Sequence, residues 1–319
     1  MDNRKINFLD YGIIFVLILL VVIFSVASEN FLKISTIFTI LKQISITGII
    51  SIGMTFVITT GGIDLSVGSI AGVSAVTAAI LMKNNYGTVF SCIVAIVLAC
   101  LYGLINGLLI TKFKMPPLIA TLGTQTSLRG LAFIVTEGLP VFGFSDTFSN
   151  FANGALWQIP YPVLLLVFIF FVAKFVLDKT LFGRYIYGVG GNEEASRLSG
   201  INTTRIKILA YVISSLMAGI AGLVLLSRTS SGQPSAGANY EMNAITSVVL
   251  GGVSLSGGEG NISLVMVGTV IMGVLSTGML MCNINDYVQQ LVQGLVLIGA
   301  VAFSYITKRI RRNLISVND

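Results

Sequence analysis

The stretch TVFSCIVAIVLACLYGLINGLLIT, residues 88–111, contains no charged residue and is long enough to cross a membrane as a helix. Across the whole chain of 319 residues, 55% are hydrophobic and only 10% are charged. A soluble domain of this size would need about a quarter of its residues charged to cover its surface. Lipid must therefore be part of the solvent, and we expect an all-α integral membrane protein.

Further apolar stretches of similar length predict a polytopic bundle of about ten transmembrane helices. The predicted spans are 11–27, 36–59, 66–82, 88–111, 117–135, 161–178, 205–227, 240–256, 262–281 and 287–306. The first span lacks a convincing small-residue cleavage site and is followed by many others, so it is interpreted as a retained helix. No flexible linker interrupts the pattern, and residues 1–319 are expected to form a single transmembrane domain.

Basic residues are unevenly distributed over the connections between these spans, which predicts an orientation. If the N-terminus is cytoplasmic, the cytoplasmic side collects Arg4, Lys5, Lys112, Lys114, Lys174, Lys179, Arg184, Arg197, Arg205, Lys207, Lys308, Arg309, Arg311 and Arg312. The loops of the other side hold Lys33, Lys83 and Arg228. Both termini are therefore expected to face the cytoplasm. The net charge of +6 reports topology, and nucleic-acid binding is a poor interpretation of it.

The residue types argue against catalysis within this chain. Histidine is absent, and so are a Walker A motif, an HExxH motif and a Gly-x-Ser-x-Gly elbow. Cys92, Cys100 and Cys282 lie in or at the ends of apolar spans without metal-site spacing. We expect no catalytic residue, no bound metal and no cofactor, and any ATP hydrolysis must occur in another subunit.

Two glycine-rich segments resemble each other and interrupt the apolar pattern in two halves of the chain. Residues 61–68 read GGIDLSVG and residues 251–258 read GGVSLSGG. Broken segments in two related halves indicate a transport path, because freed backbone groups at membrane depth need a cavity or protein partners. Two tight turns between membrane helices are the alternative. The glycines expected at the breaks are Gly61, Gly62, Gly251 and Gly252.

A few polar residues at membrane depth are candidates for a substrate pathway. Asp64 can cap the helix that follows it or contact a substrate, and the sequence leaves both roles open. Residues 121, 124 and 125 share one helix face, which can line a pore or bond to a neighbouring helix. Glu241 lies near the start of its span, where a carboxylate is expected to interact favourably with the helix dipole. Arg129 lies in the outer part of its span, beyond the polar residues 121–127. The candidate pathway residues are Asp64, Ser66, Asn106, Thr121, Thr124 and Gln125.

The longest charged connection, about residues 190–204, predicts a short cytoplasmic helix. Asn192 is a good N-cap and Gly200 suits the helix end. Such a helix is either a docking element for a partner or a solvated connector. The residues expected to make the docking contact are Asn192, Glu193, Glu194, Ala195, Ser196 and Gly200.

Three ordered motifs give the chain a family resemblance: residues 59–68, residues 190–201, and residues 233–258. With them, the sequence resembles the ribose-type permeases of bacterial carbohydrate ABC importers from about residue 30 to 308. Glu194-Ala195-Ser196 followed by Gly200 resembles the EAA-x3-G coupling loop of ABC permeases, with serine in the third place.

The resemblance implies a channel-forming subunit in the bacterial cytoplasmic membrane that moves a monosaccharide, a pentose or a hexose, into the cell. It also implies three partners: a second permease copy (the same or a related chain), a cytoplasmic ABC ATPase whose groove receives residues 192–200, and an extracytoplasmic sugar-binding protein. The main alternative is a secondary transporter driven by an ion gradient. That class would be marked by several buried carboxylates or a histidine. Asp64 alone offers few groups that could couple ion movement to substrate movement.

Overall fold

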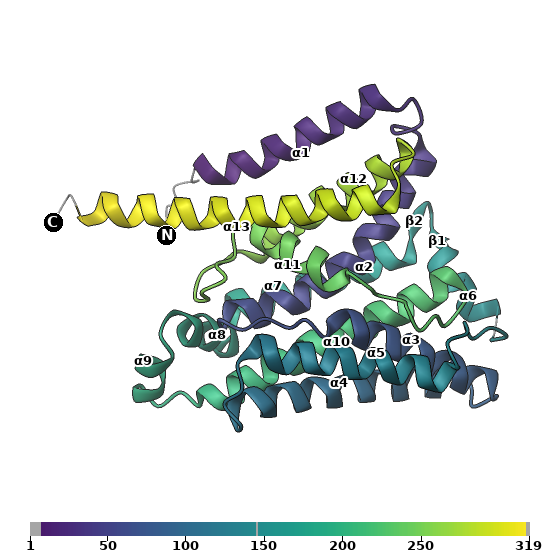
Figure 1. Ribbon diagram of the computed structural model, residues 1–319, viewed down its shortest axis with the longest axis horizontal. Helices are drawn as coiled ribbons and strands as arrows, with labels where there is room; N and C mark the ends of the chain where they lie inside the picture. Colours follow the sequence, from purple (N-terminus) through teal and green to yellow (C-terminus); the bar gives the residue numbers. More distant parts are fainter. Residues whose placement is uncertain (1–7, 145, 317–319) are drawn as a thin grey trace.

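The computed structural model describes residues 8–144 and 146–316, and almost all of its regular structure is helical. The longer helices are α1 (Phe8–Ala27), α2 (Ile34–Thr59), α3 (Val67–Lys83), α4 (Thr88–Thr111), α5 (Pro117–Thr136), α7 (Tyr161–Lys179), α10 (Thr203–Thr229), α12 (Ile262–Met281) and α13 (Asp286–Ser316). The shorter elements are α6 (Asp146–Asn153), α8 (Leu181–Gly191), α9 (Glu193–Leu198), α11 (Tyr240–Leu250), and the strands β1 (Ala155–Leu156) and β2 (Ile159–Pro160). The two strands form one antiparallel hairpin in which Ala155 faces Pro160. Figure 1 shows the arrangement.

The predicted fold class, an all-α polytopic membrane bundle, is confirmed. Within the described ranges, seven helices are long and apolar enough to cross a membrane: α2, α4, α5, α7, α10, α12 and the part of α13 from Asp286 to Ile306. Two shorter apolar helices, Gly12–Ala27 and α3, correspond to the first and third predicted spans. Each predicted span therefore coincides with a helix, but the predicted span 240–256 ends early, at Leu250 in α11.

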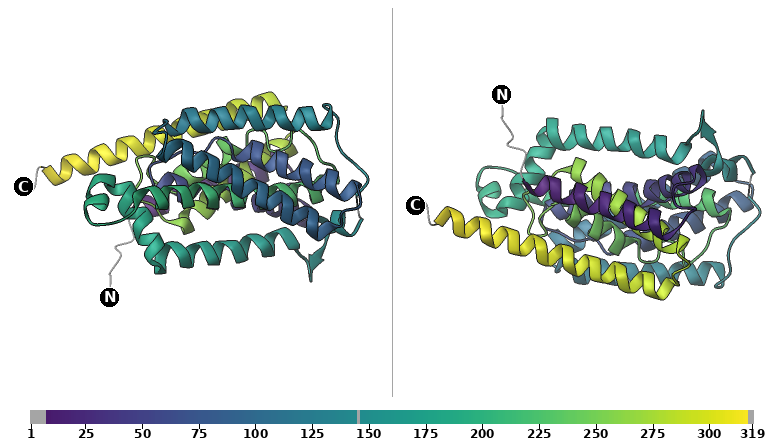
Figure 2. Two further views of the ribbon diagram at one scale, coloured as in Figure 1. Left: turned by 90° about the horizontal axis from the view of Figure 1, so that it is seen from below. Right: turned by 90° about the horizontal axis from the view of Figure 1, so that it is seen from above.

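The long helices run between two ends of the molecule (Figures 1 and 2). One end carries α8, α9 and the connection between α4 and α5, and there α1 begins and α13 ends. The other end carries the β1–β2 hairpin, α6 and the connection between α1 and α2. We call these the α9 end and the hairpin end.

The basic residues predicted to be cytoplasmic belong to elements at the α9 end. Lys112 and Lys114 follow α4, Lys179 ends α7, and Arg205 begins α10. Arg4 and Lys5 lie outside the described residues. The charge asymmetry in the sequence is therefore matched by an asymmetry between the two ends of the fold.

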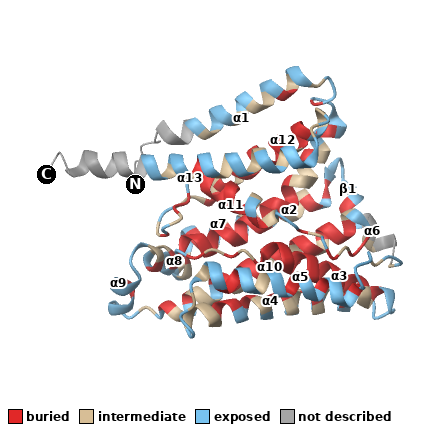
Figure 3. Cartoon of the chain, viewed as in Figure 1, coloured by how far each residue is buried: buried red, intermediate tan, exposed pale blue. Residues whose placement is uncertain are grey.

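The core is built around α2 and α10, which are buried along most of their length (Figure 3). α10 packs against α2, α3 and α4, and α2 also packs against α7, α11 and α12. Several buried hydroxyl side chains in α2 find acceptors within the helix, because they donate to carbonyls one turn back, as Ser51 does to Thr47 and Thr55 does to Ser51. By contrast, α1 and α13 lie at the periphery with apolar side chains exposed.

Small residues let these helices approach closely. A Cβ on Gly103 would lie 2.6 Å from the Tyr211 carbonyl oxygen, and one on Gly107 would lie 2.9 Å from Cα of Ile208. A Cβ on Gly222 would lie 2.2 Å from the Ala71 carbonyl oxygen. Any side chain at these positions would push α10 away from α3 and α4, so the glycine spacing fixes the width of the core.

The connection between the predicted spans 205–227 and 240–256 follows Arg228 and was expected to be a loop on the outer side. Its segment 230–239 instead runs back into the bundle beside α3 (Figure 1). Gly232 lies against Ala79, Ala236 against Gly72, and Gly237 against Gly68. The contacts descend along eleven residues of α3, or about 16 Å at the helical rise. Much of the segment is turn, with hydrogen bonds from the Ala236 N–H to Gln233 and from the Ala238 N–H to Ser235. It is non-helical backbone inside the bundle, covered by protein as such backbone must be, and we call residues 230–239 the re-entrant segment.

Candidate functional site

Asp64 is the centre of a buried hydrogen-bond network in the break between α2 and α3. Its side chain is 0% exposed. Asp64 Oδ1 accepts from the Ser66 backbone N–H at 3.0 Å and from the Ser66 hydroxyl at 2.6 Å. Asp64 Oδ2 accepts from the Ser214 hydroxyl of α10 at 3.0 Å. The carboxyl group therefore joins the start of α3 to the central helix of the core.

The network continues outward from Ser66 to α4 and α5. Asn106 Nδ2 donates to the Ser66 hydroxyl oxygen at 2.8 Å, and the Thr124 hydroxyl donates to Asn106 Oδ1 at 2.6 Å. Ser66 is thus both a donor to Asp64 and an acceptor from Asn106. A continuous chain of polar groups links α10, the break, α4 and α5, and each link orients the next.

Tyr211 of α10 holds the backbone of the same break, because its hydroxyl donates to the Ile63 carbonyl oxygen at 3.3 Å. The Thr121 hydroxyl of α5 lies 3.4 Å from the same oxygen but donates to the Pro117 carbonyl oxygen of its own helix at 2.8 Å. The Tyr211 hydroxyl leaves no room beside Gly62, where a Cβ would lie 2.5 Å from it. The break is therefore held by α10 through Tyr211, with Thr121 of α5 close to the same carbonyl group.

A small cavity lies between this break and the α9 end. Its volume is about 20 Å³, and it is lined by Thr60, Gly61, Gly62, Ile110, Pro117, Lys207 and Tyr211. That volume holds a single water molecule. A larger cavity, of about 270 Å³, lies at the hairpin end and is lined by Met82, Asn85, Gly87, Thr88, Gly143 and Phe144.

Glu241 and two polar residues of α5 form a second cluster where the re-entrant segment meets α11. Gln125 Nε2 donates to Glu241 Oε1 at 2.9 Å. Arg129 Nη1 donates to the carbonyl oxygens of Pro234 and Ala236 at 2.8 and 2.7 Å. α5 therefore holds the re-entrant segment through its backbone and the first turn of α11 through a carboxylate.

The position of Glu241 is that of a polar group inside the bundle. Its side chain is 4% exposed, and Oε2 has no hydrogen-bond partner among the described residues. α11 has only 11 residues, about 16 Å, so it is a half-helix whose N-terminus lies inside the bundle. A carboxylate in that first turn complements the helix dipole, in agreement with the role expected from the sequence.

The predicted short helix at the α9 end is present as α9, Glu193–Leu198. Asn192 caps it, because Asn192 Oδ1 accepts from the Ala195 N–H at 2.9 Å. Gly200 has φ of +84°, and the N–H groups of Gly200 and Ile201 bond to Arg197 and Ser196, which is a Schellman ending. The predicted cap and helix end are both confirmed.

The surface of α9 is open to a partner. Ser196 is its buried residue, whereas Leu198 is 80% exposed. Glu194 pairs with Arg197 within the helix, and Glu193 pairs with Lys207 of α10. The pair with Lys207 links the helix to the end of the bundle, while Leu198 stays exposed.

The two glycine pairs end their helices in the same way, but one residue out of register with the sequence similarity. α2 ends with Gly61 at φ +80°, and α11 ends with Gly252 at φ +77°. In both, the N–H groups of this glycine and of the residue after it donate to carbonyl oxygens of the last helical turn. Gly61 and Gly62 donate to Ile58 and Val57. Gly252 and Val253 donate to Val249 and Val248. Gly61 therefore corresponds to Gly252 and not to Gly251.

The structure brings five predicted pathway residues into the first network: Asp64, Ser66, Asn106, Thr121 and Thr124. The sixth, Gln125, belongs to the Glu241 cluster. Ser214 and Tyr211 complete the first network and were not predicted. They lie in an apolar span, where a serine or a tyrosine gives no signal of its own.

The chain is similar to a known family over most of its length. The model of the family described as branched-chain amino acid transport system / permease component matches residues 36–301. The ribose import permease protein RbsC of Bacillus subtilis is 43% identical over 287 residues, covering 89% of each chain. The L-arabinose transport system permease protein AraH of Escherichia coli is 36% identical over 307 residues, covering 96% of this chain and 93% of that one.

A third relative is named as part of an ABC transporter. The L-arabinose ABC transporter permease protein AraH of Azospirillum brasilense is 36% identical over 301 residues, covering 94% of this chain and 89% of the relative. No solved structure matches the chain.

Proposed function

The chain belongs to the permease family of bacterial sugar importers, and on that premise we propose that it forms the channel of an ATP-driven importer that moves a monosaccharide into the cytoplasm. It is a multi-pass membrane permease component and not itself an enzyme. The names of its relatives make ribose and arabinose the first sugars to test.

The observation that carries this proposal is the exposed, capped helix α9. It sits at the end of the bundle where basic residues gather, which the positive-inside rule assigns to the cytoplasm. A short helix with an exposed Leu198 and a fixed base suits insertion into a groove of a cytoplasmic ATPase. We propose that α9 is that docking element, with both chain termini on the same side.

The polar residues of the two clusters support a sugar path along α3, α5 and the break. Sugar hydroxyl groups exchange hydrogen bonds with serine, threonine, asparagine and glutamine side chains, which are the residues found there. We propose that the path opens when the break and the re-entrant segment move apart. The complete importer contains a second permease copy, an ATPase and an extracytoplasmic sugar-binding protein.

Reconstitution tests this proposal. The chain is placed in proteoliposomes with an ABC ATPase and a sugar-binding protein from the same organism, and uptake of labelled ribose and arabinose is measured with and without ATP. We expect uptake to require ATP, the ATPase and loaded binding protein. Uptake by this chain alone under a proton or sodium gradient would instead assign it to the secondary transporters.

A further inference from the structure

The end of α8 lies against both broken segments at once. A Cβ on Gly190 would lie 1.8 Å from the Thr59 carbonyl oxygen at the end of α2. It would also lie 2.5 Å from the backbone nitrogen of Gly258, in the segment between α11 and α12. That nitrogen donates to the Thr59 carbonyl oxygen at 2.9 Å. Three backbones therefore meet at one point with no side chain between them.

Glycines on the facing segment make the same contact from the other side. A Cβ on Gly257 would lie 2.7 Å from the Gly61 nitrogen and 3.0 Å from Cα of Gly190. Gly257 and Gly258 both have positive φ, +81° and +78°, which side chains rarely adopt. We call Thr59, Gly61, Gly190, Gly257 and Gly258 the glycine junction.

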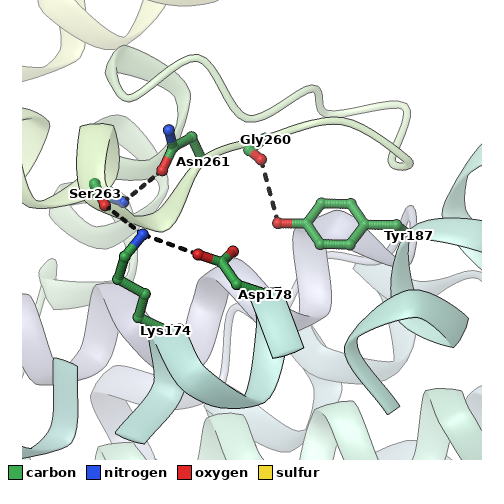
Figure 4. Close-up of polar contacts among 6 residues, drawn as sticks. All are labelled: Lys174, Asp178, Tyr187, Gly260, Asn261 and Ser263. Carbon is green, nitrogen blue, oxygen red and sulfur yellow. Dashed lines mark hydrogen bonds and ion pairs between the residues drawn. The ribbon is translucent and has the colours of Figure 1, made fainter. Parts of the chain in front are cut away.

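Beside the junction, polar contacts bind α8 to the same segment and α7 to the start of α12 that follows it (Figure 4). The Tyr187 hydroxyl of α8 donates to the Gly260 carbonyl oxygen at 3.2 Å. Lys174 of α7 donates to the Ser263 hydroxyl oxygen at 3.1 Å and pairs with Asp178 at 2.9 Å. The segment 251–261 is thus tied to α8 through Gly260 and to the end of α2 through Gly258, and the first turn of α12 that follows it is tied to α7.

The glycine junction is also next to α9 along the chain. α8 ends at Gly191, and Asn192 alone separates it from Glu193, the first residue of α9. Ser196 of α9 packs close to Gly188 of α8. A Cβ built on Gly188 would lie 3.4 Å from the Ser196 hydroxyl oxygen. A displacement of α9 therefore reaches the junction through one short, packed helix.

We propose that the glycine junction is the positioning element that transmits motion of α9 to both breaks together, so that the α2–α3 and α11–α12 segments open as one unit. This rests on the proposed function, in which an ATPase moves α9. Direct contact between backbones suits this role, because closely packed groups have low compressibility and pass on a small displacement. Gly190 and Gly258 are the positioning residues, and Tyr187 supports them.

Two neighbouring glycines of α8 give a matched test. Gly190→Ala inserts a methyl group between Thr59 and Gly258, whereas Gly191→Ala meets its nearest atom, Cα of Gly258, at 4.0 Å. Both changes raise helix propensity equally. In the reconstituted importer we expect Gly190→Ala to retain the ATPase and its rate of ATP hydrolysis. It should move about tenfold less sugar per ATP hydrolysed, which is the size of a typical coupling between two sites. Gly191→Ala should match the parent.

The ratio of sugar moved to ATP hydrolysed separates transmission from mere support of the fold. A destabilised permease gives less complex in the membrane, but each complex keeps its ratio. An unchanged ratio in Gly190→Ala would overturn the inference, and so would loss of ATPase binding, because the junction would then shape the α9 docking face. Failure of the parent and of Gly191→Ala to import sugar with ATP would instead reject the proposed function.

A second pair of variants decides the matter if Gly190→Ala does not accumulate in the membrane. Tyr187→Phe removes the hydroxyl that reaches Gly260 without adding volume, and Tyr185→Phe makes the same change at an exposed position of α8. We expect the sugar-to-ATP ratio to fall about fivefold in Tyr187→Phe and to stay at the parent value in Tyr185→Phe. Equal ratios in the two variants would overturn the inference.

Discussion

Asp64 shows how one buried carboxylate can organise a break between two membrane helices. It accepts three hydrogen bonds, from the Ser66 N–H and from the hydroxyls of Ser66 and Ser214, and it has no exposed surface. The sequence left open a helix cap or a contact with substrate. In the structure Asp64 holds the N–H of Ser66, the residue before α3, and links it to α10 through Ser214. Contact with substrate would require the network to open.

Replacing Asp64 should separate the structural part of this role from the rest. Asp64→Ala leaves buried donors without an acceptor, and we expect it to lower the free energy of unfolding by about 3 kcal/mol. Asp64→Asn keeps the shape and one acceptor oxygen, so we expect a loss of about 1 kcal/mol, with assembly retained but uptake abolished. Thermal unfolding in detergent and sugar uptake measure the two effects, with Asp286→Asn on the surface as the control.

Two results would contradict this account of Asp64. Equal destabilisation by alanine and asparagine would mean that the remaining oxygen contributes nothing to the fold. Normal uptake by Asp64→Asn would mean that the negative charge has no part in transport, and that a neutral hydrogen-bond acceptor is enough to position the break.

Arg129 offers a second test at single-residue scale, because one of its nitrogens holds two carbonyl groups of the re-entrant segment. Arg129→Ala removes both bonds and should let the segment detach from α3 locally. In a cysteine-free background carrying Ala236→Cys, we expect thiol labelling to become about tenfold faster. Arg129→Lys keeps a donor, so its labelling rate should lie between those of the parent and Arg129→Ala. An unchanged labelling rate in Arg129→Ala would show that other contacts hold the segment.

Among the elements, α9 depends on how its chain leaves the helix. Gly200 has a positive φ and no atom near the position of a Cβ, so any effect of substitution comes from backbone strain and not from crowding. We expect Gly200→Val to insert normally but to lose ATPase association, whereas Gly200→Asn, which tolerates this conformation, should keep most of it. Co-purification of the ATPase with the tagged permease measures the outcome.

Reversal of charge on α9 tests its docking face separately. Glu194 pairs with Arg197 on an exposed surface, where such pairs contribute little to stability. Glu194→Lys should therefore leave the amount of permease in the membrane unchanged while ATPase association falls about tenfold. Retention of the ATPase by both Glu194→Lys and Gly200→Val would show that the partner docks elsewhere.

Much of the element-scale structure could be predicted because it depends on local rules. Length and apolarity locate the spans, and Asn192 and Gly200 mark the ends of α9 by capping chemistry alone. The similarity of 61–68 to 251–258 predicts two breaks, but the register of helix endings depends on hydrogen bonds and is shifted by one residue. The segment 230–239 was missed because polar loops and re-entrant chain have the same composition.

The long-range part of the candidate site could not be predicted from one sequence. Gln125 and Glu241 lie 116 positions apart, and Asp64 and Ser214 lie 150 apart. Nothing in the local pattern states which serine of an apolar helix faces a carboxylate. Such pairs are decided by how closely the helices pack, and that depends on glycines such as Gly103 and Gly107 in other elements.

At the scale of the whole molecule, the orientation of the bundle in the membrane can be tested by labelling its two ends. Leu198 is exposed at the α9 end and Gln158 is exposed at the hairpin end. In a cysteine-free background, we expect Leu198→Cys to react with a membrane-impermeant thiol reagent only after the cells are opened, and Gln158→Cys to react in intact cells. The reverse pattern would invert the topology and remove the basis for a cytoplasmic α9.

The re-entrant segment has a consequence for how the protein is made. A translocon releases a helix into lipid when it is long and apolar, but residues 230–239 are polar and α11 spans only about half of the hydrocarbon layer. Neither is therefore expected to enter the bilayer by itself. They must settle against α3 and α5 after those helices have assembled, so biogenesis ends with a step inside the membrane, and a nascent chain halted before that step would be exposed to membrane proteases at this segment.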